Sequence, residues 1–165
     1  MTEAPAAMQG EPRDGRVGWL LVSVQFSLLG TLASEALRRR RTVGRLRGIL
    51  AAISIAGGLL IAAWGAGALG AALRAHPAPA AEATLRTDGA YRWVRHPIYS
   101  GVLLTAAGTS AAAGTWRALG AFAALVGLLQ VKARYEERLL RARFPGYQAY
   151  AAQTPRFVPR RRRGE

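Results

Sequence analysis

Long apolar runs with few charges dominate this sequence and limit the folds that it can adopt. Residues 48–73 carry no charged side chain at all, and three further runs begin at Val17, Ile98 and Trp116. A helix of a soluble protein keeps a polar face, and these runs have none. They approach or exceed the roughly 20 residues that cross a hydrocarbon layer about 30 Å thick. The sequence therefore predicts an all-α, polytopic membrane helix bundle with about four transmembrane helices.

The basic residues lie almost wholly outside those runs. The net charge is +14, and every basic residue except Lys132 is an arginine. A basic total of this size is typical of nucleic-acid-binding proteins. Here the charge sits at helix ends, where anionic lipid headgroups attract it, so we expect a bilayer with anionic lipid and no nucleic acid as the partner. The absence of Cys excludes thiolate metal sites, and two His offer too few ligands for a metal centre.

The first half of the chain reads as two transmembrane helices behind a short lead. Residues 1–16 are polar and predict a disordered N-terminal segment. A first helix is expected from Val17 to Leu37, with Gln25 facing other helices, and a second within residues 48–73. Residues 38–47 between them hold six Arg and predict a turn at headgroup level.

Residues 74–88, which include His76, predict a water-facing connection that ends in an Asp88-Gly89 turn. The next stretch, residues 89–101, combines aromatic, cationic and imidazole side chains in a way that neither a lipid core nor a basic tail explains. Pro97 suits the first position of a helix, so His96 is expected at the cap of a third membrane helix that ends near Ala113.

A fourth helix is expected from Trp116 to Arg143, antiparallel to the third, so that the two form a hairpin. Its 28 residues would span about 42 Å, more than a hydrocarbon layer of about 30 Å. Glu136 and Glu137 therefore emerge beside His96, in a cytosolic extension of the bundle. The aromatic and proline residues up to position 159 predict a tail that folds back, and residues 160–165 a basic tail that binds anionic lipid.

Four elements of this half resemble one family. They are Gly89-x-Tyr91-x-x-x-Arg95-His96-Pro97-x-Tyr99-x-Gly101, then Glu136-Glu137, then Phe144-x-x-Tyr147-x-x-Tyr150, then Arg156-x-x-Pro159. In this order they resemble the superfamily of the isoprenylcysteine carboxyl methyltransferases and phospholipid methyltransferases, over about residues 64–159. The resemblance implies methyl transfer from S-adenosylmethionine to a lipophilic acceptor. It places the cofactor in a catalytic half, residues 74–159.

The chemistry of that cofactor gives the residues roles. One of the two glutamates would bind the amine or the hydroxyls of the cofactor. His96 and nearby amides would bind its carboxylate, and a tyrosine would contact its sulfonium or adenine. A single glutamate can point squarely inward, because neighbours on a helix lie about 100° apart. The expected cofactor-binding residues are Tyr91, Val94, Arg95, His96, Tyr99, Gly101, Glu136, Glu137 and Tyr147. Arg156, or else Arg95, would hold an anionic acceptor. For an amine or hydroxyl acceptor, His96 or a glutamate would be the base. Arg156 and His96 are therefore the expected catalytic residues.

The charge distribution predicts the orientation. The side that carries the site collects 16 basic residues and the other side seven, which places the site in the cytoplasm of a bacterial inner membrane, although six Arg in the opposite turn are unfavourable. The acceptor is expected to be a lipophilic small molecule or a lipid with a carboxyl, thiol, hydroxyl or amine group. A membrane reductase that resembles the sterol reductases and uses a nicotinamide cofactor, and a non-catalytic adaptor, remain alternatives.

Overall fold

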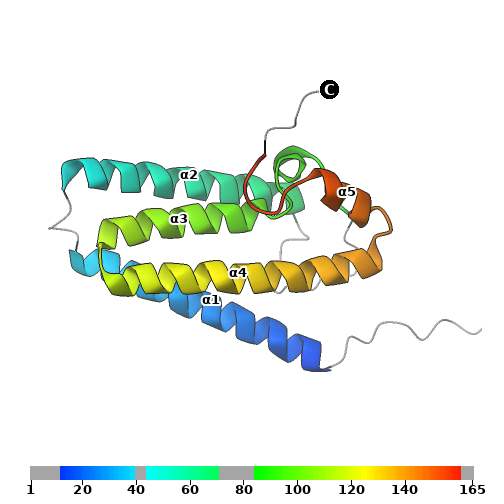
Figure 1. The fold of residues 1–165 in the computed structure, drawn as a ribbon, viewed down its shortest axis with the longest axis horizontal. Coiled ribbons are helices and arrows are strands. Elements are labelled where there is room, and N and C mark those ends of the chain that lie inside the picture. The colour runs from blue at the N-terminus through cyan, green and yellow to red at the C-terminus, as the bar shows by residue number, and fades with distance from the viewer. Residues whose placement is uncertain (1–11, 40–43, 71–83, 161–165) are drawn as a thin grey trace, which may run out of the picture.

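Four long helices lie side by side in the computed structural model, which describes residues 12–39, 44–70 and 84–160 (Figure 1). They are α1 (Pro12–Arg39), α2 (Arg45–Leu69), α3 (Pro97–Ala113) and α4 (Trp116–Arg143). Successive helices run in opposite directions, so the ends of α2 and α4 lie at the same end of the bundle as the start of α3 (Figure 1). The short helices η3 (Gly89–Arg92) and α5 (Tyr147–Gln153) lie at that end.

The helices have the composition of a membrane protein, as the sequence predicts. Within the described residues, three segments are long and apolar enough to cross a membrane: Arg16–Arg38 in α1, and the whole of α2 and α4. Helix α3, with 17 residues, is slightly shorter than these three and packs along α2 as the fourth helix of the bundle. Large apolar side chains such as Trp19, Phe26 and Leu60 are exposed and would face lipid. The chain is an integral membrane protein.

Several helix boundaries differ from those expected. Helix α1 begins at Pro12, so residues 12–16 are helical and not a disordered lead. It extends to Arg39, and α2 begins at Arg45, which shortens the arginine-rich turn. The reason is that arginine is a good helix former and does not itself end a helix. Residues 1–11, 40–43, 71–83 and 161–165 lie outside the described residues. They include His76, most of the expected connection of residues 74–88 and most of the basic tail of residues 160–165.

The reversal between α3 and α4 confirms the predicted hairpin. Gly114 adopts a left-handed conformation, with φ 62°, and its amide donates to the Ser110 carbonyl. Thr115 caps α4, because its hydroxyl accepts a hydrogen bond from the Ala118 amide at 3.1 Å. The same hydroxyl donates to Glu35 at 2.8 Å, which ties the end of α1 to the hairpin.

Helices α2 and α3 approach each other closely through glycine. A Cβ atom on Gly101 would overlap the Gly58 carbonyl oxygen and the backbone of Ala62, and a Cβ on Gly58 would overlap Thr105 and the Gly101 carbonyl. Gly101 therefore packs against α2. Its expected contact with a cofactor stays a prediction. Gly65, one turn from the end of α2, lies against Pro97 in the same way. This contact fixes the start of α3, where His96 lies.

Candidate functional site

The loop that leads into α3 has the expected geometry. Gly89 has φ 54°, and the Tyr91 amide donates to the Asp88 carbonyl at 3.0 Å, which confirms the turn. His96 is the N-terminal cap of α3 and Pro97 its first residue. The loop consequently delivers Arg95 and His96 to the end of the bundle where α4 ends.

The C-terminal tail folds back over this loop, as predicted. The Arg95 amide donates to the Pro155 carbonyl at 2.9 Å, and the His96 amide donates to the Arg156 carbonyl at 3.1 Å. These two consecutive backbone bonds fix the tail beside the cap of α3. They also set Arg156 next to His96, although 60 positions separate them in the sequence.

Helix α5 is held against the same loop. The Tyr150 hydroxyl donates to the Tyr91 carbonyl at 2.6 Å, and Arg95 Nη1 donates to the Ala151 carbonyl at 2.6 Å. Burial raises the pKa of Tyr150 to about 12, against an opposing effect of the Arg95 charge. The phenol therefore stays protonated and can keep donating.

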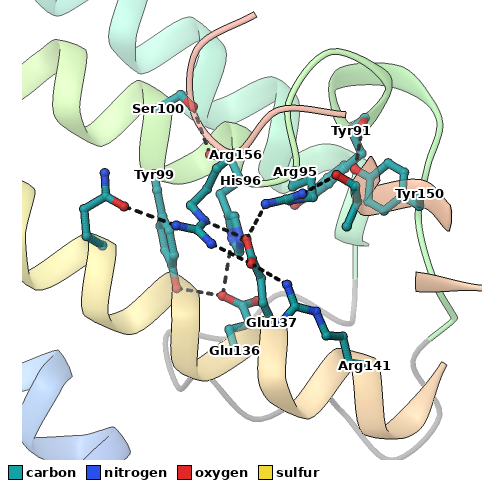
Figure 2. Close-up of polar contacts among 12 residues, drawn as sticks. Tyr91, Arg95, His96, Tyr99, Ser100, Glu136, Glu137, Arg141, Tyr150 and Arg156 are labelled. Atoms are coloured by element: carbon teal, nitrogen blue, oxygen red, sulfur yellow. Dashed lines mark hydrogen bonds and ion pairs between the residues drawn. The ribbon is translucent and has the colours of Figure 1, made fainter. Parts of the chain in front are cut away.

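Glu137 is the centre of the polar network (Figure 2). Its carboxylate is 1% exposed and contacts His96 Nε2 at 3.1 Å and Arg95 Nη2 at 3.0 Å through Oε1. Arg156 donates to both oxygens, from Nε to Oε1 at 2.8 Å and from Nη2 to Oε2 at 2.8 Å. Arg141, one turn later in α4, lies 3.5 Å from Oε2. Three separate segments, the loop, α4 and the tail, thus converge on one buried charge.

Glu136 has a different environment from its neighbour. Its side chain is 29% exposed, its Oε2 accepts a hydrogen bond from the Tyr99 hydroxyl at 3.0 Å, and the same oxygen lies 3.6 Å from His96 Nδ1. The two adjacent carboxylates therefore differ as expected for residues about 100° apart on a helix. Glu137 is enclosed by cations, and Glu136 keeps access to solvent.

The His96 ring lies between these two carboxylates and against aromatic rings. Tyr99 stacks on it with ring centroids 5.2 Å apart and planes 2° apart, and Phe157 tilts against it at 5.8 Å. Ser100 binds the Phe157 carbonyl at 2.7 Å, which holds that part of the tail in place. The imidazole is buried, so its orientation is fixed by contacts on several sides.

Two groups in this region suit a polar ligand. The Tyr147 hydroxyl and Arg95 Nε are buried and have no hydrogen-bond partner among the residues that the structure describes. Such groups are costly unless something fills their hydrogen-bonding capacity. Burial raises the pKa of Tyr147, and burial followed by the Glu136 charge raises that of Tyr91, so both phenols are neutral donors. Unpaired donors together with carboxylates fit a ligand that carries both a negative and a positive charge.

The structure thus brings together most of the residues expected from the sequence. Arg95, His96, Tyr99, Glu136, Glu137 and Arg156 contact one another directly, with Tyr91 and Tyr147 nearby. Val94 is buried and Gly101 faces α2. Sequence reasoning missed Gln130, which lies 3.4 Å from Arg156 Nη1, and Lys132. Their signal was available, because these two polar residues interrupt the otherwise apolar part of α4.

The opposite end of the bundle also has a cavity, of about 530 Å³, lined by Glu35, Arg47 and residues 113–117. Arg47 Nε donates a hydrogen bond to the Ala111 carbonyl. Glu35 is the carboxylate of that lining and already accepts a hydrogen bond from Thr115. The paired carboxylates and the imidazole are at the other end, so we assign the candidate site there.

Comparison with known proteins agrees with the geometry. Residues 46–146 match the model of the phospholipid methyltransferase family. This range contains the loop, α3 and the paired glutamates, and it ends just before α5. A comparison with curated proteins finds no match. The family match confirms the superfamily expected from the sequence and favours a membrane methyltransferase over a reductase or an adaptor.

Proposed function

This chain belongs to the phospholipid methyltransferase family, and we propose that it transfers a methyl group from S-adenosylmethionine to a lipophilic acceptor at the Glu136–Glu137 end of the bundle. The observation that carries this proposal is the convergence of Arg95, His96 and Arg156 on Glu137. It brings the loop, α4 and the tail into one polar site at the end of a membrane bundle.

The two glutamates would have different roles. Glu137 is saturated by cations and positions Arg95, His96 and Arg156. Glu136 keeps access to solvent and one oxygen close to His96, so Glu136 is the carboxylate available for the cofactor's ammonium or ribose hydroxyls. The unpartnered donors, Arg95 Nε and the Tyr147 hydroxyl, would bind its carboxylate.

The bound cofactor supplies an activated methyl group on a sulfonium. The protein's own contribution is to orient the reacting groups and to exclude water from them, which is where most of the rate of such a displacement arises. An acceptor that must lose a proton needs a base. His96 can serve, because Nε2–H donates to Glu137 and leaves the Nδ1 lone pair free, with Glu136 3.6 Å away to stabilise the imidazolium.

Arg156 has a less direct role in this proposal than the sequence indicated. Its guanidinium is paired with Glu137 through both carboxylate oxygens and lies near Gln130. A carboxylate that already neutralises Arg156 competes with any acceptor anion. Arg156 therefore positions the tail over the site, and its expected contact with the acceptor stays a prediction.

The excess of basic residues on the site's side supports a cytoplasmic location, as does the cytosolic supply of such a cofactor. A bacterial inner membrane is the proposed setting.

Calorimetric titration of the detergent-solubilised protein with S-adenosylmethionine and its demethylated product tests the proposal. We expect micromolar binding to the wild type, at least tenfold weaker binding to Glu136→Gln and His96→Ala, and unchanged binding to Glu35→Gln, a matched control at the other end of the bundle. No heat and no thermal stabilisation of the wild type would contradict the methyltransferase proposal. Binding of a reduced nicotinamide cofactor instead would favour the reductase. If neither cofactor binds, the non-catalytic adaptor is favoured.

A further inference from the structure

Lys132 is a buried ammonium one turn before Glu136 in α4. The residue is 1% exposed, and its Nζ donates a hydrogen bond to Gln25 Oε1 of α1 at 2.8 Å. The same Nζ lies 5.4 Å from the centroid of the Tyr99 ring, over the ring. It lies 16 residues beyond Trp116, or about 24 Å along the helix, so it falls within a hydrocarbon layer of about 30 Å that begins at Trp116.

The charge balance around Lys132 differs from that of its neighbours. Arg95, Arg141 and Arg156 all pair with Glu137. In the described part of the chain, no carboxylate forms an ion pair with Lys132, and its partner Gln25 is neutral. Glu136, one turn further along α4, acts on Lys132 through its charge without forming an ion pair with it. A buried cation without a direct ion pair is costly, especially at membrane depth, where ionisable groups are retained mainly for function.

We infer that Lys132 and Gln25 bind the anionic group, carboxylate or phosphate, of a lipophilic molecule that enters between α1, α3 and α4 as the methyl acceptor. This inference rests on the proposed function, because Tyr99 links the two places. The Tyr99 hydroxyl donates to Glu136, and its ring contacts both the ammonium and His96. An anion held at Lys132 therefore lies next to the residues assigned to the cofactor, on the membrane-embedded side of the site.

Helix α1 acquires a role through this contact. Gln25 lies outside the residues that match the family, 46–146, so α1 would contribute to acceptor binding from outside the matched range. The Gln25 amide fits that role, because its carbonyl orients the ammonium and its NH₂ group can donate to an anion. The simpler interpretation is that the bond only docks α1 against α4.

A glutamate at position 25 separates the two interpretations. Gln25→Glu would place a carboxylate beside the ammonium and form an internal ion pair, so the docking of α1 would be kept or strengthened. An external anion would then be displaced. A purely structural role predicts that Gln25→Glu binds anions as the wild type does.

The test uses three probes with the same chain length: laurate, dodecyl phosphate and dodecanol, each radiolabelled. Equilibrium dialysis of the protein in neutral maltoside micelles, against micelles alone, gives the affinities. We expect one or both anions to bind the wild type at least tenfold more tightly than dodecanol. The anionic probe that binds more tightly identifies the source of the anionic group as an acyl carboxylate or a lipid phosphate.

We expect Lys132→Met and Gln25→Glu to lose this preference, and Ser27→Ala, a control on α1 whose hydroxyl bonds its own helix at Ser23, to keep it. S-adenosylmethionine should bind all four proteins alike. Equal affinities of the wild type for the three probes, or a preference that survives in both variants, would overturn the inference. If the acceptor inference is overturned but the wild type binds S-adenosylmethionine, the methyltransferase proposal is still supported. If the wild type does not bind S-adenosylmethionine, the methyltransferase proposal is contradicted.

Discussion

Glu137 and Arg156 form a bidentate ion pair that joins α4 to the C-terminal tail across 19 residues of sequence. Two bonds of 2.8 Å, from Nε to Oε1 and from Nη2 to Oε2, hold the guanidinium against the carboxylate. Among the described residues, two backbone bonds from Arg95 and His96 and one bond from the Ser100 hydroxyl also hold the tail here. The position of the tail over the site therefore depends in part on the ion pair, and disruption of the pair should affect stability and binding together.

Glu137→Gln is expected to destabilise the protein. The change leaves Arg95, His96 and Arg156 without a buried negative charge, and loss of one partner of a buried pair costs about 3–5 kcal/mol. The 27% exposure of the Arg156 side chain places the loss at the lower end, because water can solvate the freed guanidinium. Thermal unfolding in detergent, followed by near-ultraviolet circular dichroism, measures the effect.

Glu136→Gln is the matched control for that experiment, since it lies on the same turn but is partly exposed. It should unfold close to the wild type while binding the cofactor more weakly. Equal destabilisation by the two changes would show that Glu137 has no special place in the network.

Gly101→Ala is expected to disturb the contact between α2 and α3. The added methyl group would meet the α2 backbone at Gly58 and Ala62, and such overpacking costs about 1–3 kcal/mol. Gly67→Ala is the control, because nothing lies within 4 Å of its Cβ position, and alanine in an exposed helix position is favoured over glycine by about 1 kcal/mol. The two unfolding midpoints should move in opposite directions. A stabilised Gly101→Ala would contradict the close approach.

The helices and the motif were predictable because each depends on local sequence. Charge-free runs indicate membrane helices whatever packs against them, and Pro97 and Thr115 mark helix starts through their own backbone and hydroxyl chemistry. The expected bounds of α4, Trp116 to Arg143, are those observed. The position of the glutamates beside the loop followed from topology. The place of the tail beside them followed from its aromatic and proline residues and from the family resemblance.

The division of labour between Glu136 and Glu137 was not predictable, since it depends on the rotation of α4 about its axis. That rotation is set by packing against other helices, which sequence spacing does not report. The packing of Gly101 against α2 was not predicted, for a related reason. A glycine in a motif suits either a ligand or a neighbouring helix, and only the position of α2 decides between them.

Tyr150→Phe is expected to change the response to alkaline pH. Burial raises the pKa of Tyr150 from about 10 in an unfolded chain to about 12, so the folded state retains the phenolic proton more strongly. The stability from this group is therefore complete below pH 10 and declines as the pH rises from 10 to 12. The variant should lose about 1 kcal/mol at neutral pH, through the missing bond to the Tyr91 carbonyl, and show a flatter decline. Tyr91 and Tyr147 titrate in both proteins, so the difference between the two profiles isolates Tyr150, and parallel profiles would contradict its assigned role.

Cysteines introduced singly at Arg86 and Arg117 are expected to label from opposite sides of the membrane. The chain has no cysteine of its own, and both positions are exposed, the first in the loop before α3 and the second at the start of α4. In intact bacterial cells, an impermeant maleimide should modify Arg117→Cys at once and Arg86→Cys only after the membrane is permeabilised. That result would place the site in the cytoplasm, in agreement with the larger basic total on its side. The reverse pattern would put the arginine-rich turn of residues 38–47 in the cytoplasm, and it would require a cofactor supply outside the inner membrane. Labelling of both from one side would contradict a bundle in which α3 traverses the layer between the two positions.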